Sequence, residues 1–235
     1  MPSEHAIWIV STGFSPFRGL FSSGAASFIS RRNNRVTLIE VGEGLPNSGY
    51  YFALDPQQYL LPAVDIEGCI NKWISPSLRY ACAGESGLLT PFSTGFRKTD
   101  RPHFLISAFT YRGVEKFSVL ERTANQTSCF CCIDRSSSFM PDVFLVINSG
   151  SDTSAEHLLR EIAEFAPDTP ILWTGGALPE STPDLDIEEV APPEINGLGM
   201  DSRRPPDSGS FLSFMNGISQ KVSMAIKENR KTAAG

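Results

Sequence analysis

Residues 6 to 44 hold the pattern that most limits the fold of this chain. The apolar run Ile7 to Val10 is followed by a loop from Gly13 to Gly19, a helix predicted from about Phe21, and a second apolar run, Val36 to Ile39. A strand, a glycine-bounded loop and a helix in this order are typical of phosphate-binding units, where loop N–H groups and the helix N-terminus attract the anion. The segment therefore predicts an α/β fold in which the two apolar runs are neighbouring parallel strands.

The loop departs from the phosphate-binding pattern GxxxxGK[ST] at the positions that carry its chemistry. Leu20 takes the place of the lysine, Phe21 takes the place of the Ser/Thr, and the two glycines enclose five residues instead of four. Arg18 is the only cation in the loop. A vestigial phosphate site would comprise Gly13, Arg18, Gly19, Ser22 and Ser23. The alternative is that Arg18 is a solvated charge and that the two serines cap or pack the helix.

Apolar side chains fill this loop, whereas phosphates need polar, solvated walls. The residues concerned are Phe14, Phe17, Leu20 and Phe21. We expect them to contact a partner protein or to fill the vacated pocket.

The rest of the chain alternates between strand and helix patterns, which predicts a doubly wound, mainly parallel sheet with helices on both faces. The predicted strands are Leu88–Phe92, His103–Phe109, Cys129–Ile133, Asp142–Ile147, Pro170–Thr174 and Leu185–Val190; the predicted helices lie within 55–85, at 114–122, at 155–165 and at 210–229. In the first of these helices, Asp65, Ile66, Cys69, Ile70, Trp73 and Ile74 recur at helical spacing. Residues 196–209 are rich in Gly and Pro and predict a loop before the last helix. We expect residues 1–235 to form a single domain.

Composition narrows the classes of function. A net charge of −6 without a dense Lys/Arg tract argues against nucleic-acid binding. No apolar run approaches the length of a membrane span, and the first ten residues lack the pattern of an export signal. Three of the five cysteines, Cys129, Cys131 and Cys132, lie in one apolar run, which favours a buried strand in a reduced protein over a metal site. We therefore expect a cytoplasmic protein.

Several segments resemble the MinD/ParA group of deviant-Walker P-loop ATPases. VTLIEVGEG stands where the family has an LIDxD segment, with Glu40 and Gly42 for the two aspartates, and FCCIDRSSS supplies Asp134 after a middle strand. The segments VFLVINSGSDTSAEHLLREI, ILWTGGALPE and IEEVAPPEI are similar to later family segments in order. Residues 142–174 are also similar to a receiver domain, with Asn148 at the place of the phosphorylatable aspartate.

The resemblance implies a P-loop NTPase-like sandwich of three layers and face-to-face dimers. In the family, the residue at Asp134 holds magnesium through water; here it could instead bond its own turn. Because neither family lysine is present, we expect no catalytic residue, no cofactor and no ATPase activity. The chain would act as a regulatory, adaptor or positioning factor through protein contacts, with itself or with an active paralogue.

Two other functions remain open. One is an active ATPase with a nonstandard loop, binding ATP or ADP with Mg²⁺ through Arg18 and Asp134. The other is a small-ligand enzyme whose site lies at the carboxyl edge of the sheet near Asp134 and Asn148. The resemblance also raises the possibility of a membrane anchor in the C-terminal helix. However, the cations of that helix gather near its end, which favours a docked core helix.

Overall fold

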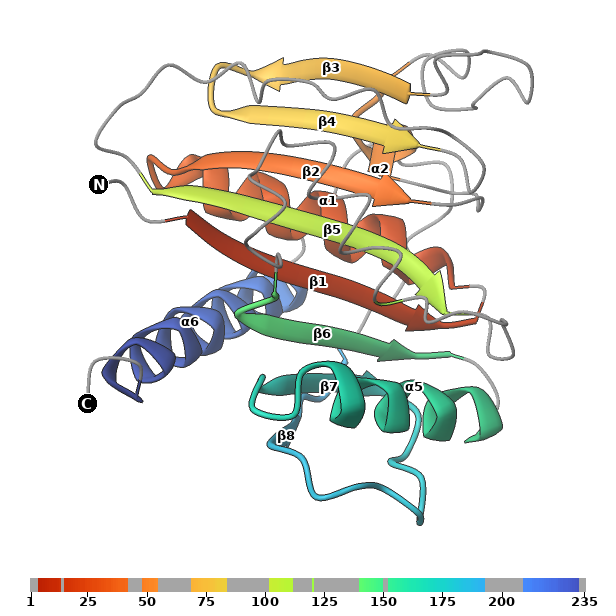
Figure 1. The fold of residues 1–235 in the computed structure, drawn as a ribbon. Helices are drawn as coiled ribbons and strands as arrows, with labels where there is room; N and C mark the ends of the chain where they lie inside the picture. Colours follow the sequence, from red (N-terminus) through yellow and green to blue (C-terminus); the bar gives the residue numbers. More distant parts are fainter. Residues whose placement is uncertain are drawn as a thin grey trace.

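The computed structural model describes residues 4–13, 15–41, 48–54, 69–83, 102–111, 120, 140–149, 152–192 and 209–232. Within these residues lies an eight-stranded sheet of order β3-β4-β2-β5-β1-β6-β7-β8 (Figure 1). The strands are β1 (Glu4–Thr12), β2 (Arg35–Val41), β3 (Cys69–Ser75), β4 (Leu78–Ala83), β5 (His103–Tyr111), β6 (Val143–Asn148), β7 (Ile171–Gly175) and β8 (Ile187–Glu189). All neighbouring strands are parallel except β3 and β4. The predicted α/β class with a mainly parallel sheet is confirmed.

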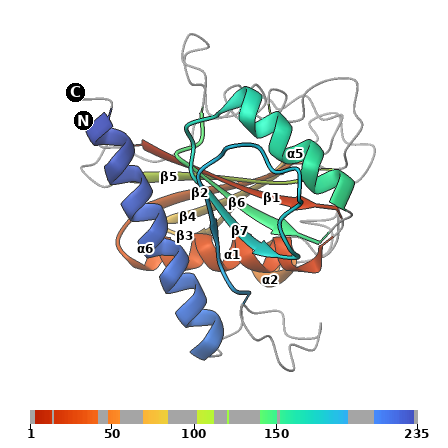
Figure 2. The same ribbon diagram turned by 90° about the horizontal axis from the view of Figure 1, so that it is seen from below.

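The helices within the described residues are α1 (Pro16–Arg31), α2 (Ser48–Tyr51), α5 (Asp152–Phe165) and α6 (Gly209–Thr232). Figure 2 shows α1 and α5 on opposite sides of the sheet. Apolar residues of α1 and α6 share one core cluster with one face of the strands, and those of α5 share a second cluster with the other face. The sheet is therefore covered on both sides, which explains why β6 is buried at every position.

The prediction that the first two strands are neighbours is wrong. β1 pairs with β5 and β6, while β2 pairs with β4 and β5, so that β5 lies between β1 and β2. The crossover from β1 through α1 to β2 leaves one strand position between them, and β5 occupies that position. The apolar pattern of a strand records that it is buried on both faces but does not record which strand lies beside it.

The prediction of a helix over residues 69–74 is also wrong, because these residues form β3 of an antiparallel hairpin with β4. Pro76 and Ser77 make the turn between the two strands. The segment contains several β-branched and aromatic residues, and tertiary pairing prevails over the helical spacing of its apolar residues.

Helix α1 begins at Pro16, five residues before the predicted start at Phe21. Ser15 is the N-cap, with an extended backbone (φ −135°, ψ 119°), and its Oγ accepts a hydrogen bond of 3.2 Å from the N–H of Phe17. Proline suits the first helical position because its φ is fixed near the helical value and the missing N–H has no partner within the helix. The predicted loop of residues 13–19 thus shrinks to residues 13–15.

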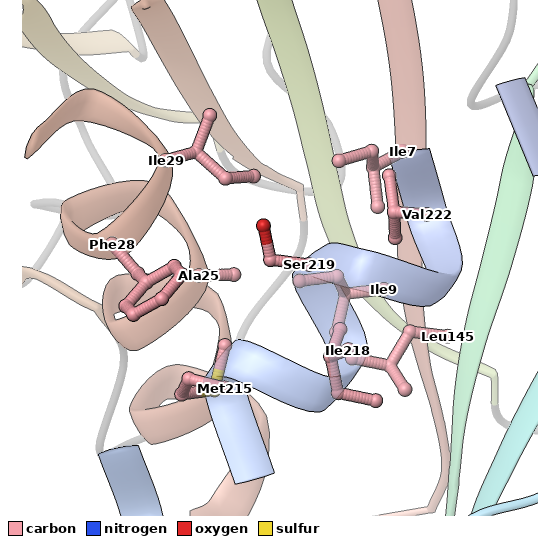
Figure 3. A pocket seen from close by; sticks show the side chains of 10 residues that line it. All are labelled: Ile7, Ile9, Ala25, Phe28, Ile29, Leu145, Met215, Ile218, Ser219 and Val222. Carbon is pink, nitrogen blue, oxygen red and sulfur yellow. The ribbon is translucent and has the colours of Figure 1, made fainter. Parts of the chain in front are cut away.

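Helices α1 and α6 cross closely at Gly24, where an added Cβ would lie 2.6 Å from Cζ of Phe211. Next to this crossing, the two helices and strands β1 and β6 enclose a small apolar cavity of about 10 Å³ (Figure 3). Its walls include Ile9, Ala25 and Val222, and Ser219 also lines it. A space of this size holds about one water molecule, so the cavity is a packing defect rather than a ligand site.

The remaining predicted elements from His103 onward that fall on described residues agree with the structure to within a few residues. They are the strands β5, β6, β7 and β8 and the helices α5 and α6. Outside the described residues lie the predicted strands Leu88–Phe92 and Cys129–Ile133, nearly all of the predicted helix 114–122, and residues 196–208 of the predicted loop.

Candidate functional site

The carboxyl ends of β1, β5 and β6 lie side by side and form the place where a ligand site is expected. Helix α1 leaves β1 towards β2 on one face of the sheet, whereas α5 leaves β6 towards β7 on the other face. Neighbouring strands whose connections diverge in this way leave a crevice outside their carboxyl ends. Polar residues meet there, and we call them the carboxyl-edge cluster: Ser11, Thr12, Arg18, Thr110 and Asn148.

Between β1 and β6, hydrogen bonds within the chain bridge the crevice. Oγ1 of Thr12 donates to Oδ1 of Asn148 (2.7 Å) and accepts from the N–H of Ser149 (3.1 Å). Nδ2 of Asn148 donates to the carbonyl oxygen of Ala177 (3.2 Å). Asn148, which occupies the place of a phosphorylatable aspartate in the receiver-like interpretation, therefore joins three segments and has both ends of its side-chain amide engaged.

Two glycines pack directly on Asn148. Gly175 has a φ of +105°, and a Cβ there would lie 2.4 Å from the carbonyl oxygen of Asn148. At Gly176 a Cβ would lie 2.8 Å from Nδ2 of Asn148, and the N–H of Gly176 donates to the Asn148 carbonyl oxygen (3.1 Å). A side chain at Gly175 would clash with the backbone at the end of β6 and would be strained by the positive φ, whereas one at Gly176 would displace the Asn148 amide.

Between β1 and β5, the cluster contains a buried arginine that has no carboxylate partner among the described residues. The side chain of Arg18 is 3% exposed, and its Nη1 donates to Oγ1 of Thr110. Oγ of Ser11 donates to the same Thr110 oxygen (3.2 Å). Nε of Arg18 is buried and has no hydrogen-bond partner in the part of the chain that the structure describes. The expectation of a solvated Arg18 is thus wrong: the guanidinium lies inside the protein, held by a neutral hydroxyl.

The N-terminus of α1 has few donors left for an anion. Pro16 has no N–H, the N–H of Phe17 donates to Oγ of Ser15, and the N–H of Arg18 donates to the carbonyl oxygen of Ser15 (3.2 Å). Gly13, with a φ of 112°, makes the turn out of β1. The described residues of this segment contribute no lysine, and their helix N-terminus is capped from within the chain.

The other residues of the predicted phosphate site are engaged within the protein. Ser22 and Ser23 are fully buried, and their hydroxyls donate to the carbonyl oxygens of Arg18 (2.7 Å) and Leu20 (3.0 Å). Such bonds to the preceding helical turn are common for serine in a helix. Gly19 lies inside α1, and its carbonyl oxygen accepts from Oγ of Ser48 (3.2 Å). The structure does not bring these groups together around an anion.

The apolar residues of the predicted loop divide into buried and exposed ones. Leu20 and Phe21 are each 2% exposed and belong to the core, where the Phe21 ring packs against the rings of Phe211 and Phe214. Phe17 is 42% exposed and stacks on Phe21 with ring centroids 6.1 Å apart. Phe14 lies outside the described residues. Among the described residues of this set, only Phe17 can meet a partner without rearrangement.

Glu40 is buried in a separate network beyond β5. Its carboxylate accepts hydrogen bonds from the N–H of Ser48 (2.9 Å), the hydroxyl of Ser48 (3.0 Å) and the hydroxyl of Tyr80 (2.8 Å). Ser48 is the first residue of α2, so Glu40 fixes the start of that helix. Burial raises the pKa of Tyr80 well above its usual range, and the Glu40 carboxylate raises it further. With three donors already bound, Glu40 is a structural carboxylate.

The structure describes only some of the residues that could bind a metal ion. Asp134, Gly42 and the cysteines at 129, 131 and 132 lie outside the described residues. Within the residues that are described, no three His, Cys, Asp or Glu side chains come together in a group that could hold a metal ion. Asp134 as a magnesium ligand thus stays a prediction.

Thr12 and Thr110 belong to the carboxyl-edge cluster but were not singled out in the sequence. Both lie at or next to the last residue of a strand, after an apolar run. A hydroxyl at the carboxyl end of a buried parallel strand is the signal that could have found them.

The sequence matches no family model, and no curated protein is similar to it in sequence. Among solved structures, the fold resembles that of a ParA family ATPase from Chlorobium tepidum TLS, with a TM-score of 0.45 and 13% sequence identity over 95% of this chain and 97% of that chain. A likeness at this TM-score and identity does not decide the family or the function of the chain. In the described part of the chain, no helix has an apolar stretch that would suffice to cross a bilayer.

Proposed function

We propose that this chain is a degenerate relative of the MinD/ParA-like ATPases that binds no nucleotide and acts as a regulatory, adaptor or positioning factor through protein contacts. The observation that carries the proposal is the start of α1 at Pro16. A phosphate-binding loop needs several free backbone N–H groups between the strand and the helix. Here the connection is residues 13–15, and the side chain and carbonyl oxygen of Ser15 take two of the first helical N–H groups.

The burial of Leu20 supports the same proposal. In a working loop a lysine at this position reaches the outer phosphates, but Leu20 points into the core and is 2% exposed. Phe21, its neighbour, is equally buried and packs on α6. Phe21 stabilises the α1–α6 contact and Leu20 belongs to the same core cluster, whereas a nucleotide site would need polar groups in their place.

The protein contact is proposed to include Phe17. This ring is 42% exposed at the first turn of α1, and the stack on Phe21 restricts its motion. Aromatic rings that are partly exposed and already ordered contribute strongly to protein interfaces, because little side-chain entropy is lost on binding. The proposed partner is a second copy of this chain or a related active ATPase.

Nucleotide binding is tested by thermal unfolding with and without Mg²⁺ and ATP. A ligand at ~1000 times its dissociation constant stabilises the folded state by about 4 kcal/mol, which is roughly 10 °C in melting temperature for a chain of this size. We expect no shift with about 1 mM ATP, a concentration that would saturate a micromolar site. A shift of several degrees that ADP reproduces would contradict the proposal and favour an active ATPase.

Self-association is tested by sedimentation of the wild type and of Phe17→Ala over a range of concentrations. We expect a dimer that Phe17→Ala weakens by about tenfold or more, since truncation of an aromatic residue central to an interface costs more than 1 kcal/mol. Met224→Ala is the matched control, because Met224 is 59% exposed on α6, a different helix. Equal weakening by both variants would argue against a specific role of Phe17.

A further inference from the structure

We propose that the buried guanidinium of Arg18 is a binding site for a carboxylate, either on a small molecule or on an acidic side chain of a partner. An arginine side chain stays charged in a protein at any accessible pH. Burial of a charge is costly unless the charge is paired, so a buried guanidinium is usually found next to a carboxylate or a phosphate. Arg18 is 3% exposed, and the only hydrogen-bond partner of its guanidinium among the described residues is the hydroxyl of Thr110.

The buried carboxylate nearest along the sheet does not fill this role. Glu40 lies on β2, and its oxygens accept hydrogen bonds from Ser48 and Tyr80. No ion pair between Glu40 and Arg18 is present in the described part of the chain. Within the described residues, the charge of Arg18 is therefore not met by a direct contact with a carboxylate.

The free edge of the guanidinium fits a carboxylate better than a phosphate chain. Nη1 is bound to Thr110, while Nε is buried and no described residue bonds it. Nε and Nη2 share the side of the guanidinium on which two parallel N–H groups match the two oxygens of a carboxylate. A polyphosphate would need further donors from the start of α1, and Pro16 and the Ser15 cap leave few of them.

The position of the guanidinium supports a ligand site rather than a tie between α1 and the sheet alone. Nη1 reaches Thr110, the residue before the last one of β5, next to the carboxyl end of β1. This is the edge of a parallel sheet where ligands bind. The partial positive charge at the start of α1 adds to the attraction for an anion. The inference goes beyond the proposed function, because such a site could bind a free carboxylate whether or not the chain has a protein partner.

The direct test follows the side-chain Nε–H resonance of Arg18 by NMR during titrations with acetate, glutarate, chloride and inorganic phosphate at equal ionic strength. We expect saturable shifts with acetate and glutarate, with dissociation constants on the order of 1 mM, and no saturable shift with chloride. A peptide of blocked glutamate and leucine, compared with its glutamine analogue, shows whether an acidic side chain binds as the free acids do. Saturation by phosphate at lower concentration than by acetate, or no saturable shift with any carboxylate, would overturn the proposal.

Two variants separate recognition from folding. Arg18→Lys keeps the charge but lacks the planar guanidinium. The apparent affinity for glutarate, measured from its stabilising effect in thermal unfolding, should therefore fall at least tenfold. Arg18→Met removes the unpaired charge, and we expect a melting temperature no lower than that of the wild type and no response to glutarate. Arg31→Met, at the exposed end of α1, should respond to glutarate as the wild type does. If Arg18→Met retained the full response, the proposal would be wrong, whatever its stability.

Discussion

The hydroxyl of Tyr80 on β4 donates a hydrogen bond of 2.8 Å to the carboxylate of Glu40 on β2. Both side chains are buried, Tyr80 completely and Glu40 to 1% exposure. The same carboxylate accepts two hydrogen bonds from Ser48 at the start of α2. One buried side chain thus joins two strands and a helix, and its polar atoms are satisfied by these three hydrogen bonds.

Tyr80→Phe should destabilise the protein by about 1–3 kcal/mol at neutral pH, because it leaves a buried carboxylate with one donor fewer. Urea unfolding monitored by circular dichroism measures this loss. Glu40→Gln and the double variant complete a cycle, in which the two substitutions should be less than additive because they share one hydrogen bond. Additive losses would show that the bond contributes nothing beyond packing.

The same pair predicts a loss of stability at alkaline pH. The pKa of Tyr80 is raised well above 10 in the folded protein, chiefly by burial, whereas in the unfolded chain it is near 10. The stability due to the protonated hydroxyl is present below pH 10 and falls above it, by up to about 1.4 kcal/mol per pH unit. Tyr51, whose pKa is raised to about 12, acts in the same direction. Free energies of unfolding at pH 9, 10 and 11 should fall less steeply for Tyr80→Phe than for the wild type.

Gly24→Ala should destabilise the contact between α1 and α6 by about 1–3 kcal/mol, because its Cβ would meet the buried ring of Phe211 at 2.6 Å. Gly217→Ala in α6 is the control, since a Cβ there has nothing within 4 Å. This second change should stabilise the protein by about 0.5–1 kcal/mol through helix propensity. Thermal unfolding of both variants tests the opposite signs; equal effects would contradict the close crossing.

Ser15→Ala should cost about 1 kcal/mol, because it removes the acceptor for the N–H of Phe17 at the start of α1. Ser15→Gly should cost only a few tenths of this amount, as glycine is tolerated at the N-cap. Ser213→Ala changes an exposed serine inside α6 and should be neutral or slightly stabilising. A loss for Ser15→Ala no greater than that for Ser213→Ala would mean that α1 does not depend on this cap.

Val222→Ile should stabilise the protein by about 0.8 kcal/mol, the transfer free energy of one methylene group. Val222 lines the apolar cavity between α1, α6 and the sheet, whose volume of about 10 Å³ leaves space for the added carbon. Chemical denaturation provides the measurement, and a destabilisation of 1 kcal/mol or more, typical of overpacking, would show that the cavity is closed in solution.

The sequence predicts the later part of the fold well because its signals are local and agree with one another. The run DVFLVI marks the buried strand β6, and a capped amphipathic pattern follows it as α5. The sequence-based prediction fails at residues 69–74, because the apolar residues of a hairpin strand happen to recur at helical spacing. The Pro76–Ser77 turn and the flanking aromatic residues could have indicated the hairpin. The order of the strands could not be predicted, because pairing partners leave no trace in the periodicity of a strand.

The sequence directed attention to the segment after β1, but it did not predict the packing of Arg18 and of the two serines found there. The apolar run of β1 identified the carboxyl edge, and Arg18 lies there. The start of α1 was misplaced because the pair Ser15 and Pro16, an N-cap followed by proline, was counted as part of a loop. The burial of Arg18 and the engagement of the Ser22 and Ser23 hydroxyls within α1 follow from that shift. Such burial depends on tertiary packing, which a single sequence does not reveal.

The turn that lies against Asn148 gives a pattern by which distant homologues can be recognised. A side chain at Gly175 would displace the backbone at the end of β6, and one at Gly176 would displace the amide of Asn148, which bonds Thr12 of β1 and Ala177 after β7. Close packing therefore limits substitution at these two glycines, independently of any ligand or partner. Distant homologues should therefore be sought by an asparagine that ends one buried strand and a glycine pair at the end of the next.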